Sequence, residues 1–466
     1  MKKILALWLF WGMSVNIPQA YPQEMLSPKA LTLEECIDVA LKRRPELDVA
    51  TLDVLNSEYQ VKEATSYYYP RLNFSTGYTR FMGPENFTAN VDITQVTAPL
   101  NEFLPSAGIP IALPLTLEQE FQAGKTNWFN VTFDLNQPVY TFGRIEEGIK
   151  QARIGRSVAF NQKEKKKEEI IFEVKRGYYQ LLFSKKLLDL TREAEAGADV
   201  VVRMVKIDYE TSIPEKEEKG TTRLDYLKAR NFLAEVKVRL SEAGKNVKLA
   251  ELGLKMAIGM DPSLPLKVTE VPLESLPHDR NSGEMKEWTL ERNLDIKNLR
   301  LGVELFDSKR KSASKEYLPK IGIQGQYIGP EDRFGTPNFW YAGIGITMPI
   351  FDGFSTRAKV GQAEVQFNKA KAQKSLLESA LVVQIDRLNT DLTEFRERVG
   401  IFKMAVMEAQ ERAQLAADGY AVGSTEYDEL LLAQRSELEV KSGYLQSLYH
   451  YYRTRAELEF VSGVPR

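Results

Sequence analysis

The chain has 466 residues, and its 62 basic and 64 acidic side chains leave a net charge of −2 at pH 7. Because nucleic-acid-binding proteins gather basic residues on one surface, this balance predicts no nucleic-acid partner. A single cysteine, Cys36, excludes an internal disulfide and a cysteine-rich metal site. The two histidines, His278 and His450, stand in unrelated contexts, so we interpret them as surface residues rather than as a metal site or an acid–base pair.

The sequence also contains no pattern that indicates reaction chemistry. Carboxylates such as Glu34 and Glu35 are abundant in helical segments, yet no nucleophile–base constellation accompanies them. The glycines occur mainly at turns and in strands, without the spacing of a phosphate-binding loop. We therefore expect a protein that is not an enzyme and that has no catalytic residue, no cofactor and no metal.

Residues 1–20 are typical of a secretory signal peptide. Lys2 and Lys3 supply positive charge, a short apolar run follows, and the segment ends near Ala20. Pro18 occupies a position that usually holds a small residue before the cleavage site. The apolar run is short compared with the ~20 residues that a spanning helix needs, and no later run reaches that length. We expect an exported protein in which any membrane crossing uses strands.

Two copies of one layout follow. Gln-Pro-Val-Tyr at 137–140 is echoed by Met-Pro-Ile-Phe at 348–351, and the same spacing then leads to a Gln-Ala pair in each copy. Self-similarity of this kind indicates a duplicated structural unit. The sequence therefore predicts a first structural repeat over 21–261, an inter-repeat linker over 262–285 and a second structural repeat over 286–466.

Each repeat contains two segments in which apolar and polar residues alternate, the period typical of strands. Strands are predicted near 71–81, 127–137, 320–329 and 338–348. Apolar-out, polar-in segments of ~10 residues are typical of a transmembrane barrel, although an ordinary half-buried sheet also explains each strand taken singly. The connection over 82–126 is long and rich in proline, and we expect it to be an exposed functional loop outside the cell.

Helical patterns surround the strands. Near 31–67 we expect a helix that Thr32 and Glu35 cap and that Pro45 interrupts. Helical hairpins are predicted over two further ranges, 143–260 and 353–462. Apolar residues in these hairpins recur at alternating spacings of four and three, a heptad pattern. One such seam is Leu381, Ile385, Leu388, Leu392, Phe395, Val399, Phe402 and Val406.

Each outgoing helix would be ~100 Å long if unbroken, at 1.5 Å per residue. That length is sufficient to bridge much of a periplasm. The alternative is a dimeric coiled-coil rod, which has no use for four amphipathic strands.

Three features together resemble the TolC family of outer membrane efflux proteins. They are the opening Leu31-Thr32-Leu33-Glu34-Glu35, the two proline-containing joints, and the hairpin Gly419-Tyr420-Ala421-Val422-Gly423-Ser424 with Leu431-Leu432-Ala433-Gln434 after it. The resemblance covers nearly the whole mature chain. It implies a mainly α fold with a membrane β-barrel. In that fold each chain of a homotrimer gives four strands to one shared barrel, and a trimeric α-helical barrel continues from it. The strand count agrees independently, because four strands are fewer than the ~8 of the smallest membrane barrels and every strand edge in lipid must be paired.

The resemblance also implies a function and a location. The protein is expected in the cell outer membrane, in contact with its lipid, and extending into the periplasm. It would be the exit duct of a tripartite efflux or type I secretion system, and would passively conduct substrates that an inner-membrane pump delivers through a periplasmic adaptor protein. The alternative is a secreted periplasmic coiled-coil adaptor or structural protein.

Two sets of site residues follow from the same resemblance. The adaptor-contact tip comprises Val422, Gly423, Ser424, Gly220 and Thr221. Gly423 is expected to take a positive φ, which lets two helices reverse closely. The first hairpin turn, 212–220, is longer, charged and contains a proline, and so departs from the family pattern.

The periplasmic gate comprises Tyr420, Asp225 and Glu429. On the family pattern, Tyr420 would hydrogen-bond Asp225 and Glu429 would face the lumen. A solvated helix residue is the other interpretation of Glu429. Leu432 and Thr425 stand where the family places charged residues, so this tip is expected to be less charged than those of some relatives.

Overall fold

A computed structural model describes residues 30–80, 82, 86–122, 127–211, 221–270, 276, 282–331 and 337–463. The expected signal peptide, 1–20, lies outside these residues. The chain divides into two compact units, and each takes segments from both sequence repeats. The helical unit comprises Met1–Leu52, Asn161–Lys297 and Leu376–Arg466, and the sheet unit comprises Asp53–Phe160 and Asn298–Ser375.

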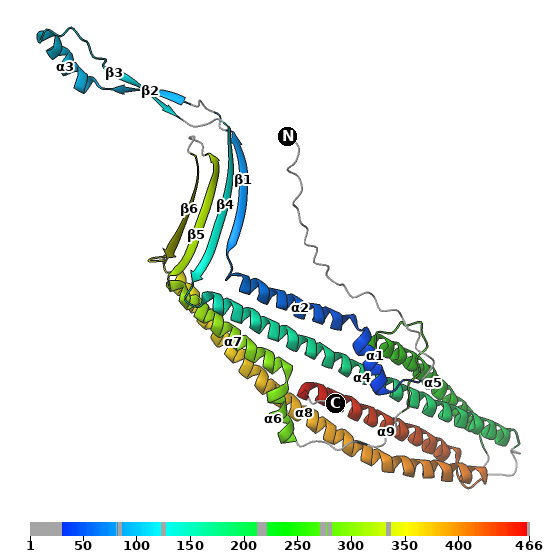
Figure 1. Ribbon diagram of the computed structural model, residues 1–466. Helices are drawn as coiled ribbons and strands as arrows, with labels where there is room; N and C mark the ends of the chain where they lie inside the picture. The colour runs from blue at the N-terminus through cyan, green and yellow to red at the C-terminus, as the bar shows by residue number, and fades with distance from the viewer. Residues whose placement is uncertain are drawn as a thin grey trace. The chain divides into compact units, whose positions relative to one another are not determined.

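The sheet unit is built on four antiparallel strands in the order β1-β4-β5-β6 (Figure 1). The strands are β1 (Arg71–Arg80), β4 (Asn127–Tyr140), β5 (Lys320–Glu331) and β6 (Pro337–Thr347). They occupy the four ranges in which apolar and polar residues alternate in the sequence. Each repeat contributes two strands, and the pair of β4 with β5 joins the repeats.

The register of the strands separates apolar from polar side chains onto opposite faces. On one face Phe74 pairs with Phe133, which pairs with Tyr327, which pairs with Trp340. Adjacent rings in this row lie 5.1 Å apart between Phe74 and Phe133 and 6.2 Å apart between Phe133 and Tyr327. Within the single chain Tyr327 is half-buried, but Phe74, Phe133 and Trp340 remain exposed, and the side chain of Trp340 is 77% exposed. The sheet therefore presents an apolar face that the chain does not cover by itself.

The opposite face of the sheet is polar. On this face Asn73, which precedes Phe74 on β1, pairs with Asp134, which follows Phe133 on β4. Gln326 lies beside Asp134 on β5 and donates a hydrogen bond of 2.6 Å to its Oδ1. Because a strand exposes alternate residues to opposite sides, this polar row and the aromatic row cannot exchange faces without a shift in register.

The connection over 82–126 has regular structure that the sequence analysis did not predict. It contains β2 (Asn86–Asp92), α3 (Thr94–Ser106) and β3 (Thr116–Gln122), and the two strands form an antiparallel ribbon. The helix contains Pro99 and Pro105. Proline inside a helix removes a backbone donor and so argues against a helix from sequence alone. The sequence analysis described this connection only as an exposed loop and did not predict these three elements.

The two long helices begin at matching joints after the strands. Helix α4 (Arg144–Thr211) follows β4, and α8 (Ser355–Ala421) follows β6. Immediately before them Phe142 and Phe354 adopt positive φ values of 54° and 66°. A left-handed conformation costs an ordinary residue roughly 1–2 kcal/mol. The occurrence of the same unfavourable conformation at both joints shows that the repeats turn from strand to helix in a similar way.

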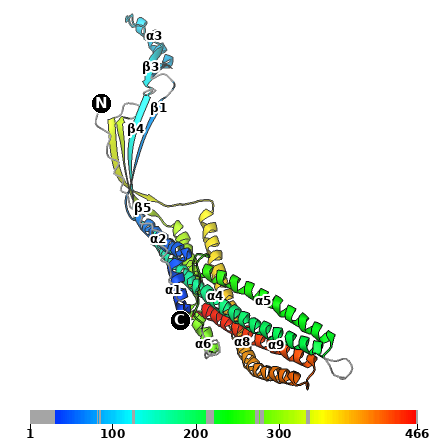
Figure 2. The same ribbon diagram turned by 90° about the vertical axis from the view of Figure 1, so that its right-hand side faces the viewer.

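The helical unit consists of two antiparallel hairpins, α4 with α5 (Arg223–Ala257) and α8 with α9 (Tyr427–Ser462), as Figure 2 shows. The shorter helices are α1 (Leu33–Arg43), α2 (Pro45–Ser66), α6 (Ser282–Arg292) and α7 (Leu294–Ser314), and a 3₁₀ turn, η1 (Lys315–Tyr317), follows α7. The helix break predicted at Pro45 is confirmed, and so is the capping box of Thr32 and Glu35. Helices α2, α4, α7 and α8 contribute residues to both units.

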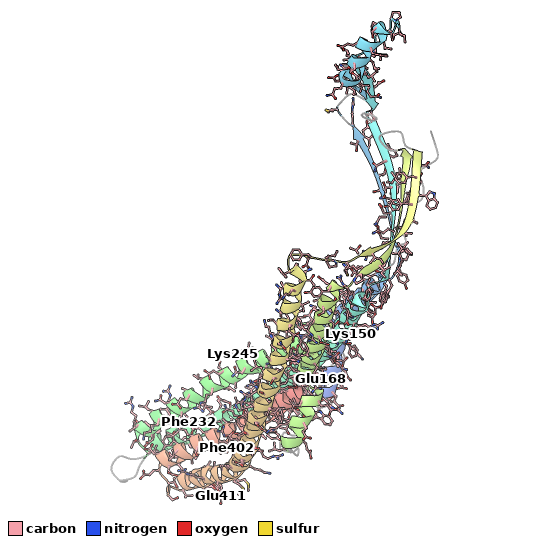
Figure 3. All side chains as sticks on the ribbon, turned by 90° about the vertical axis from the view of Figure 1, so that its left-hand side faces the viewer. Lys150, Glu168, Phe232, Lys245, Phe402 and Glu411 are labelled. Atoms are coloured by element: carbon pink, nitrogen blue, oxygen red, sulfur yellow. The ribbon has the colours of Figure 1, made fainter. Side chains whose placement is uncertain are left out.

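The heptad seam of α8 is buried as its spacing predicts. Leu381, Ile385, Leu388 and Leu392 pack in one cluster with Tyr451 of α9. Further along the same pair of helices the Phe402 ring, labelled in Figure 3, lies over Gly443. A Cβ atom at Gly443 would stand 2.6 Å from that ring, so only glycine admits this contact. Among the helices of the described ranges, none is both long enough and apolar enough to cross a membrane.

A half-buried ion cluster joins α4 of the first repeat to α9 of the second. The Lys175 Nζ lies 2.6 Å from one carboxylate oxygen of Glu459, and the Arg455 Nε lies 3.1 Å from the other. Burial alone would raise the pKa of Glu459, but the two cations hold this pKa below its ordinary value. Glu459 is therefore ionised at neutral pH. Removing one partner would leave an uncompensated charge, a change that is strongly destabilising for buried pairs.

The seam of α8 provides a direct test of the packing. We expect Ile385→Ala to lower the free energy of unfolding by about 2–5 kcal/mol, because it leaves a cavity in a fully buried position. Val383 stands two residues earlier with a side chain that is 68% exposed, so Val383→Ala should change stability by less than about 0.5 kcal/mol. Denaturant unfolding in detergent, followed by circular dichroism, measures both. Equal effects would contradict the assigned seam.

Candidate functional site: the hairpin tip

The tip of the second hairpin is a tight turn between α8 and α9. Gly423 has a φ of 76°, which confirms the predicted positive value. Its amide donates to the Tyr420 carbonyl at 3.1 Å, and the Ser424 amide donates to the Gly419 carbonyl at 2.8 Å. These bonds satisfy carbonyl groups that the end of a helix leaves without partners. The side chain of Val422 is 79% exposed, so the turn presents an accessible surface.

The returning helix of the first hairpin begins at a complete capping box. The Thr222 Oγ1 accepts a hydrogen bond from the Asp225 amide at 3.2 Å, and the Asp225 Oδ2 accepts one from the Thr222 amide at 3.0 Å. Burial tends to raise the pKa of Asp225, but the Thr222 bonds and the nearby Lys228 ammonium bring it below its ordinary value. Asp225 is therefore a charged residue that holds the start of its own helix.

Tyr420 bonds a different residue from the one expected. Its hydroxyl lies 3.2 Å from the Thr221 Oγ1, and this bond joins the two hairpins. The expected bond from Tyr420 to Asp225 is wrong for this chain, because the Asp225 carboxylate is occupied by Thr222 and Lys228. Burial raises the pKa of Tyr420 to about 12, so this hydroxyl stays neutral at neutral pH. Gly220 and the charged turn 212–220 lie outside the described residues.

Two ion pairs that the sequence analysis missed connect α5 to α9 at the tip. The Lys228 Nζ lies 2.6 Å from the nearer carboxylate oxygen of Asp428, and the Arg435 Nη2 lies 3.0 Å from Glu235. The bond to Asp428 is the main reason why the pKa of Lys228 is raised. Both pairs join residues 200 positions apart, and each helix places its two members seven residues apart. Matching charges at heptad spacing were a signal by which the sequence could have revealed these pairs.

Glu429 forms an ion pair within its own hairpin. Its Oε1 lies 2.8 Å from the Arg412 Nη2 on α8. Both side chains are about half exposed, so the pair adds only ~0.2–1 kcal/mol. Thr425, at the position where a gating arginine was considered, packs close to Gly419 instead. In the described part of the tip, the charged groups named here are therefore paired within one chain.

The core beneath these polar contacts mixes alanines with larger side chains. Ala229, Ala413, Ala416 and Ala433 cluster with the rings of Tyr420 and Tyr427 and with a few aliphatic side chains. The two rings meet edge to face at 6.1 Å between centroids. The Tyr427 hydroxyl is buried, and no hydrogen-bond partner for it occurs within the described ranges. The two tyrosines therefore differ: one bonds across the hairpins and the other only packs.

The model of a family described as "Outer membrane efflux protein" matches residues 36–260 and 287–464. The chain belongs to this outer membrane efflux protein family. Membership places the protein in the cell outer membrane, in a family of channels rather than of enzymes. The two matched segments fall one within each predicted sequence repeat, in agreement with the resemblance that their motifs indicated.

Individual relatives are distant in sequence but similar in fold. The outer membrane protein TolC of Escherichia coli (strain K12) is 21% identical over 188 residues, which span 37% of this chain and 38% of TolC. The structure of VceC from Vibrio cholerae superposes with a TM-score of 0.72 at 16% identity, and covers 92% of this chain and 96% of its own. The Campylobacter jejuni CmeC outer membrane channel gives a TM-score of 0.72 at 15% identity, and covers 96% and 93%. The mainly helical fold is therefore that of the outer membrane channels.

The two tip tyrosines provide a matched pair of substitutions. Tyr420→Phe removes a hydroxyl that bonds Thr221, and we expect it to lower the free energy of unfolding by about 0.5–1.5 kcal/mol. Tyr427→Phe removes a buried hydroxyl without a partner, and we expect it to leave stability unchanged or raised. Thermal unfolding of the detergent-solubilised protein separates the two. If Tyr427→Phe destabilised more than Tyr420→Phe, the assignment of the hydrogen bond would be refuted.

Proposed function

We propose that the protein is the exit duct of a tripartite efflux or type I secretion system. It conducts substrates passively across the outer membrane after an inner-membrane pump has delivered them through a periplasmic adaptor. The observation that carries the proposal is the four-stranded sheet, which has one apolar face, one polar face and two free edges. Family membership gives the location, and the sheet gives a physical reason for a channel at that location.

The sheet supports a membrane crossing by strands. Its strands are 10, 14, 12 and 11 residues long in the order β1, β4, β5 and β6. A tilted strand needs about 9–11 residues to cross the hydrocarbon core. In this proposal the aromatic row from Phe74 to Trp340 faces lipid, and the polar row from Asn73 to Gln326 faces a water-filled channel. The alternative of a soluble coiled-coil adaptor leaves the exposed apolar face unexplained.

The sheet edges support a homotrimer. Within the described chain β1 pairs only with β4 and β6 pairs only with β5. A strand edge in lipid leaves backbone groups without partners, at several kcal/mol each. The backbone groups of both edges find partners when β1 of one copy of the chain pairs with β6 of the next copy. Three chains together supply twelve strands, an even number inside the range of about 8–26 found in outer membrane proteins.

The helices and their tip support the periplasmic part of the proposal. Helices α4 and α8 contain 68 and 67 residues, which at 1.5 Å per residue gives each a length of ~100 Å. We infer that they form the wall of a tunnel and that the tip binds the adaptor through Val422, Gly423, Ser424 and Thr221. Gly220 belongs to the same proposed surface by sequence. Tyr420, Asp225 and Glu429 are assigned to the gate, where they stabilise the closed arrangement of the hairpins.

The assembly is tested by size and conductance. We expect the protein in mild detergent to be a trimer that forms pores in a planar bilayer, because only closure of the sheet pairs both of its edges. Light scattering coupled to size-exclusion chromatography gives the mass, and single-channel recording gives the conductance. A monomer or dimer that is soluble in water without detergent would contradict the proposal and favour the coiled-coil alternative.

The adaptor surface is tested at Gly423. We expect Gly423→Trp to abolish crosslinking to the cognate adaptor and to stop export, because it adds a large side chain at the exposed turn. Gly423→Asn is the control, since asparagine tolerates a positive φ and keeps the turn. Trimer mass should be unchanged in both variants. Normal crosslinking and export by Gly423→Trp would remove Gly423 from the adaptor surface.

A further inference from the structure

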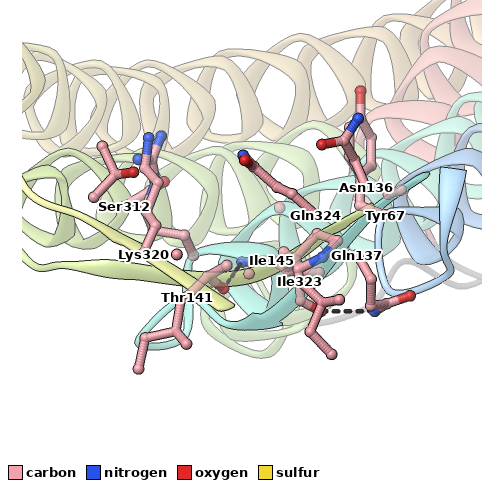
Figure 4. Close-up of a pocket in the computed structure, with 17 residues that line it drawn as sticks. Tyr67, Asn136, Gln137, Thr141, Ile145, Ser312, Lys320, Ile323 and Gln324 are labelled. Carbon is pink, nitrogen blue, oxygen red and sulfur yellow. Dashed lines mark hydrogen bonds between the residues drawn. The ribbon is translucent and has the colours of Figure 1, made fainter. Parts of the chain in front are cut away.

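A cavity of about 680 Å³ lies within the sheet unit, where the strands meet the helices. It is lined by the bases of β4, β5 and β6 together with α2, the start of α4 and the end of α7 (Figure 4). Cavities of roughly 300–1,000 Å³ are of the size that holds small molecules. The strand residues of the lining include Asn136, Gln324, Lys320 and Thr347, which the register places on the polar face of the sheet.

The lining is cationic. Arg144 and Lys320 contribute positive charges, and none of the described lining residues is Asp or Glu. Arg144 is only partly neutralised, because its ion pair with Glu316 is long, 3.6 Å, and Lys359 lies nearer to the same carboxylate at 2.9 Å. Besides the hydrogen bond from Lys359, the charges of Arg144 and Lys320 help to lower the pKa of Glu316, so this one carboxylate is shared by three cations. The cavity therefore holds positive charge that can bind an anion.

Amide and apolar groups complete the lining. Asn136 and Gln324 are cross-strand neighbours, and in the described structure their side-chain amides make no hydrogen bond. Figure 4 shows these two side chains and Lys320 directed to the same side of the strands. Pro138 and Ile145 add apolar surface to the lining. Donors without partners beside apolar surface are suited to a molecule with an anionic group on an apolar body.

The space in the cavity depends on glycines. Gly322 and Gly345 are opposite each other on β5 and β6, and both line the cavity. A Cβ atom at Gly345 would meet no atom within 4 Å, so this position opens directly into free space. Gly361 on α8 is equally open but does not line the cavity. The two glycines are therefore a matched pair for a test by filling.

We propose that this cavity is a binding site for soluble anionic amphiphiles. Arg144 and Lys320 bind the anionic group, Asn136 and Gln324 donate hydrogen bonds to it, and Ile145 packs on the apolar body. The polar face of the sheet provides the charged and amide groups of the site, although two isoleucines of the opposite face also line it. This favours a molecule arriving from water over a membrane lipid. The identification of this molecule as cargo in transit rests on the proposed function. Such a site gives the duct a preference for one substrate class.

The test uses the full trimer in dodecyl maltoside and two fluorescent probes of similar shape. Pyrene-1-butyrate carries a carboxylate, and pyrene-1-butyl-trimethylammonium carries a cation instead. Fluorescence anisotropy is measured against empty micelles. We expect saturable binding of the carboxylate probe, binding of the cationic probe at least about tenfold weaker, and loss of the preference at high salt as charges are screened.

Two pairs of variants locate the site. Gly345→Phe fills the cavity and should weaken binding of the carboxylate probe at least tenfold, whereas Gly361→Phe should leave it unchanged. Lys320→Gln removes a charge in the lining and should weaken binding, whereas Lys369→Gln removes an exposed charge on α8 outside the lining and should not. One pair changes the volume of the cavity and the other pair changes its charge. If a variant of one pair fails to fold, the other pair still tests the site.

Several outcomes would overturn the proposal. They are no saturable binding, equal binding of the two probes, or equal effects within either pair of variants. Displacement of the carboxylate probe by phosphatidylglycerol in nanodiscs, but not by excess butyrate-type amphiphile, would assign the cavity to lipid instead of cargo. Trimer mass and conductance are recorded for every variant. Absence of probe binding by the unsubstituted trimer, with normal conductance, rejects this site alone, whereas probe binding without pores rejects the proposed duct.

Discussion

The unmet hydrogen-bonding capacity of the sheet edges is the constraint on which the rest of the structure depends. Strands β1 and β6 each have one neighbour within the described chain, and the apolar face between them is exposed. A soluble protein would cover such a face with its own helices or would leave it polar. An apolar face and open edges are consistent with each other only when lipid covers the face and further copies pair with the edges. In this family, the fold of one chain is therefore part of a larger closed arrangement.

The two sequence repeats supply the parts of this arrangement in duplicate. Each repeat supplies two strands and one long hairpin, and the joints of both repeats place a phenylalanine at positive φ, Phe142 and Phe354. The energetic cost of this conformation persists only where the surroundings determine it strongly. Beyond the joints the repeats differ. The first repeat contains the ribbon of β2 and β3 with α3, whereas the corresponding connection of the second repeat is only a few residues long.

The parts of the fold that follow from local periodicity could be predicted from the sequence. A strand such as β4 alternates Phe129, Val131 and Phe133 with polar residues, and the α8 seam repeats at heptad spacing, so both elements were found. Helix α3 was missed because Pro99 outweighed its pattern, and its flanking strands were missed although Phe87, Ala89 and Val91 alternate.

Partners at the tip were harder to predict than elements. The choice of Thr221 over Asp225 by the Tyr420 hydroxyl depends on which acceptors are already occupied. That information is three-dimensional, and no spacing rule supplies it. The ion pairs of Lys228 with Asp428 and of Glu235 with Arg435 were accessible in principle, because their heptad spacing is visible in the sequence.

The composition of the helical unit also explains why its tip is suited to movement. Away from the tip, the core contains large side chains such as Tyr451, Ile385 and Leu388, and helices there bury much apolar area. At the tip the core contains alanines, which bury less area and so contribute less hydrophobic stabilisation. Polar links between the hairpins, Tyr420 to Thr221 and Lys228 to Asp428, provide part of the remaining stabilisation. Water can replace such links at a small net cost in free energy, since a typical hydrogen bond contributes only ~0.5–1.5 kcal/mol. A region held in this way is expected to open at lower free energy than the cluster around Ile385, and the proposed gate requires this difference.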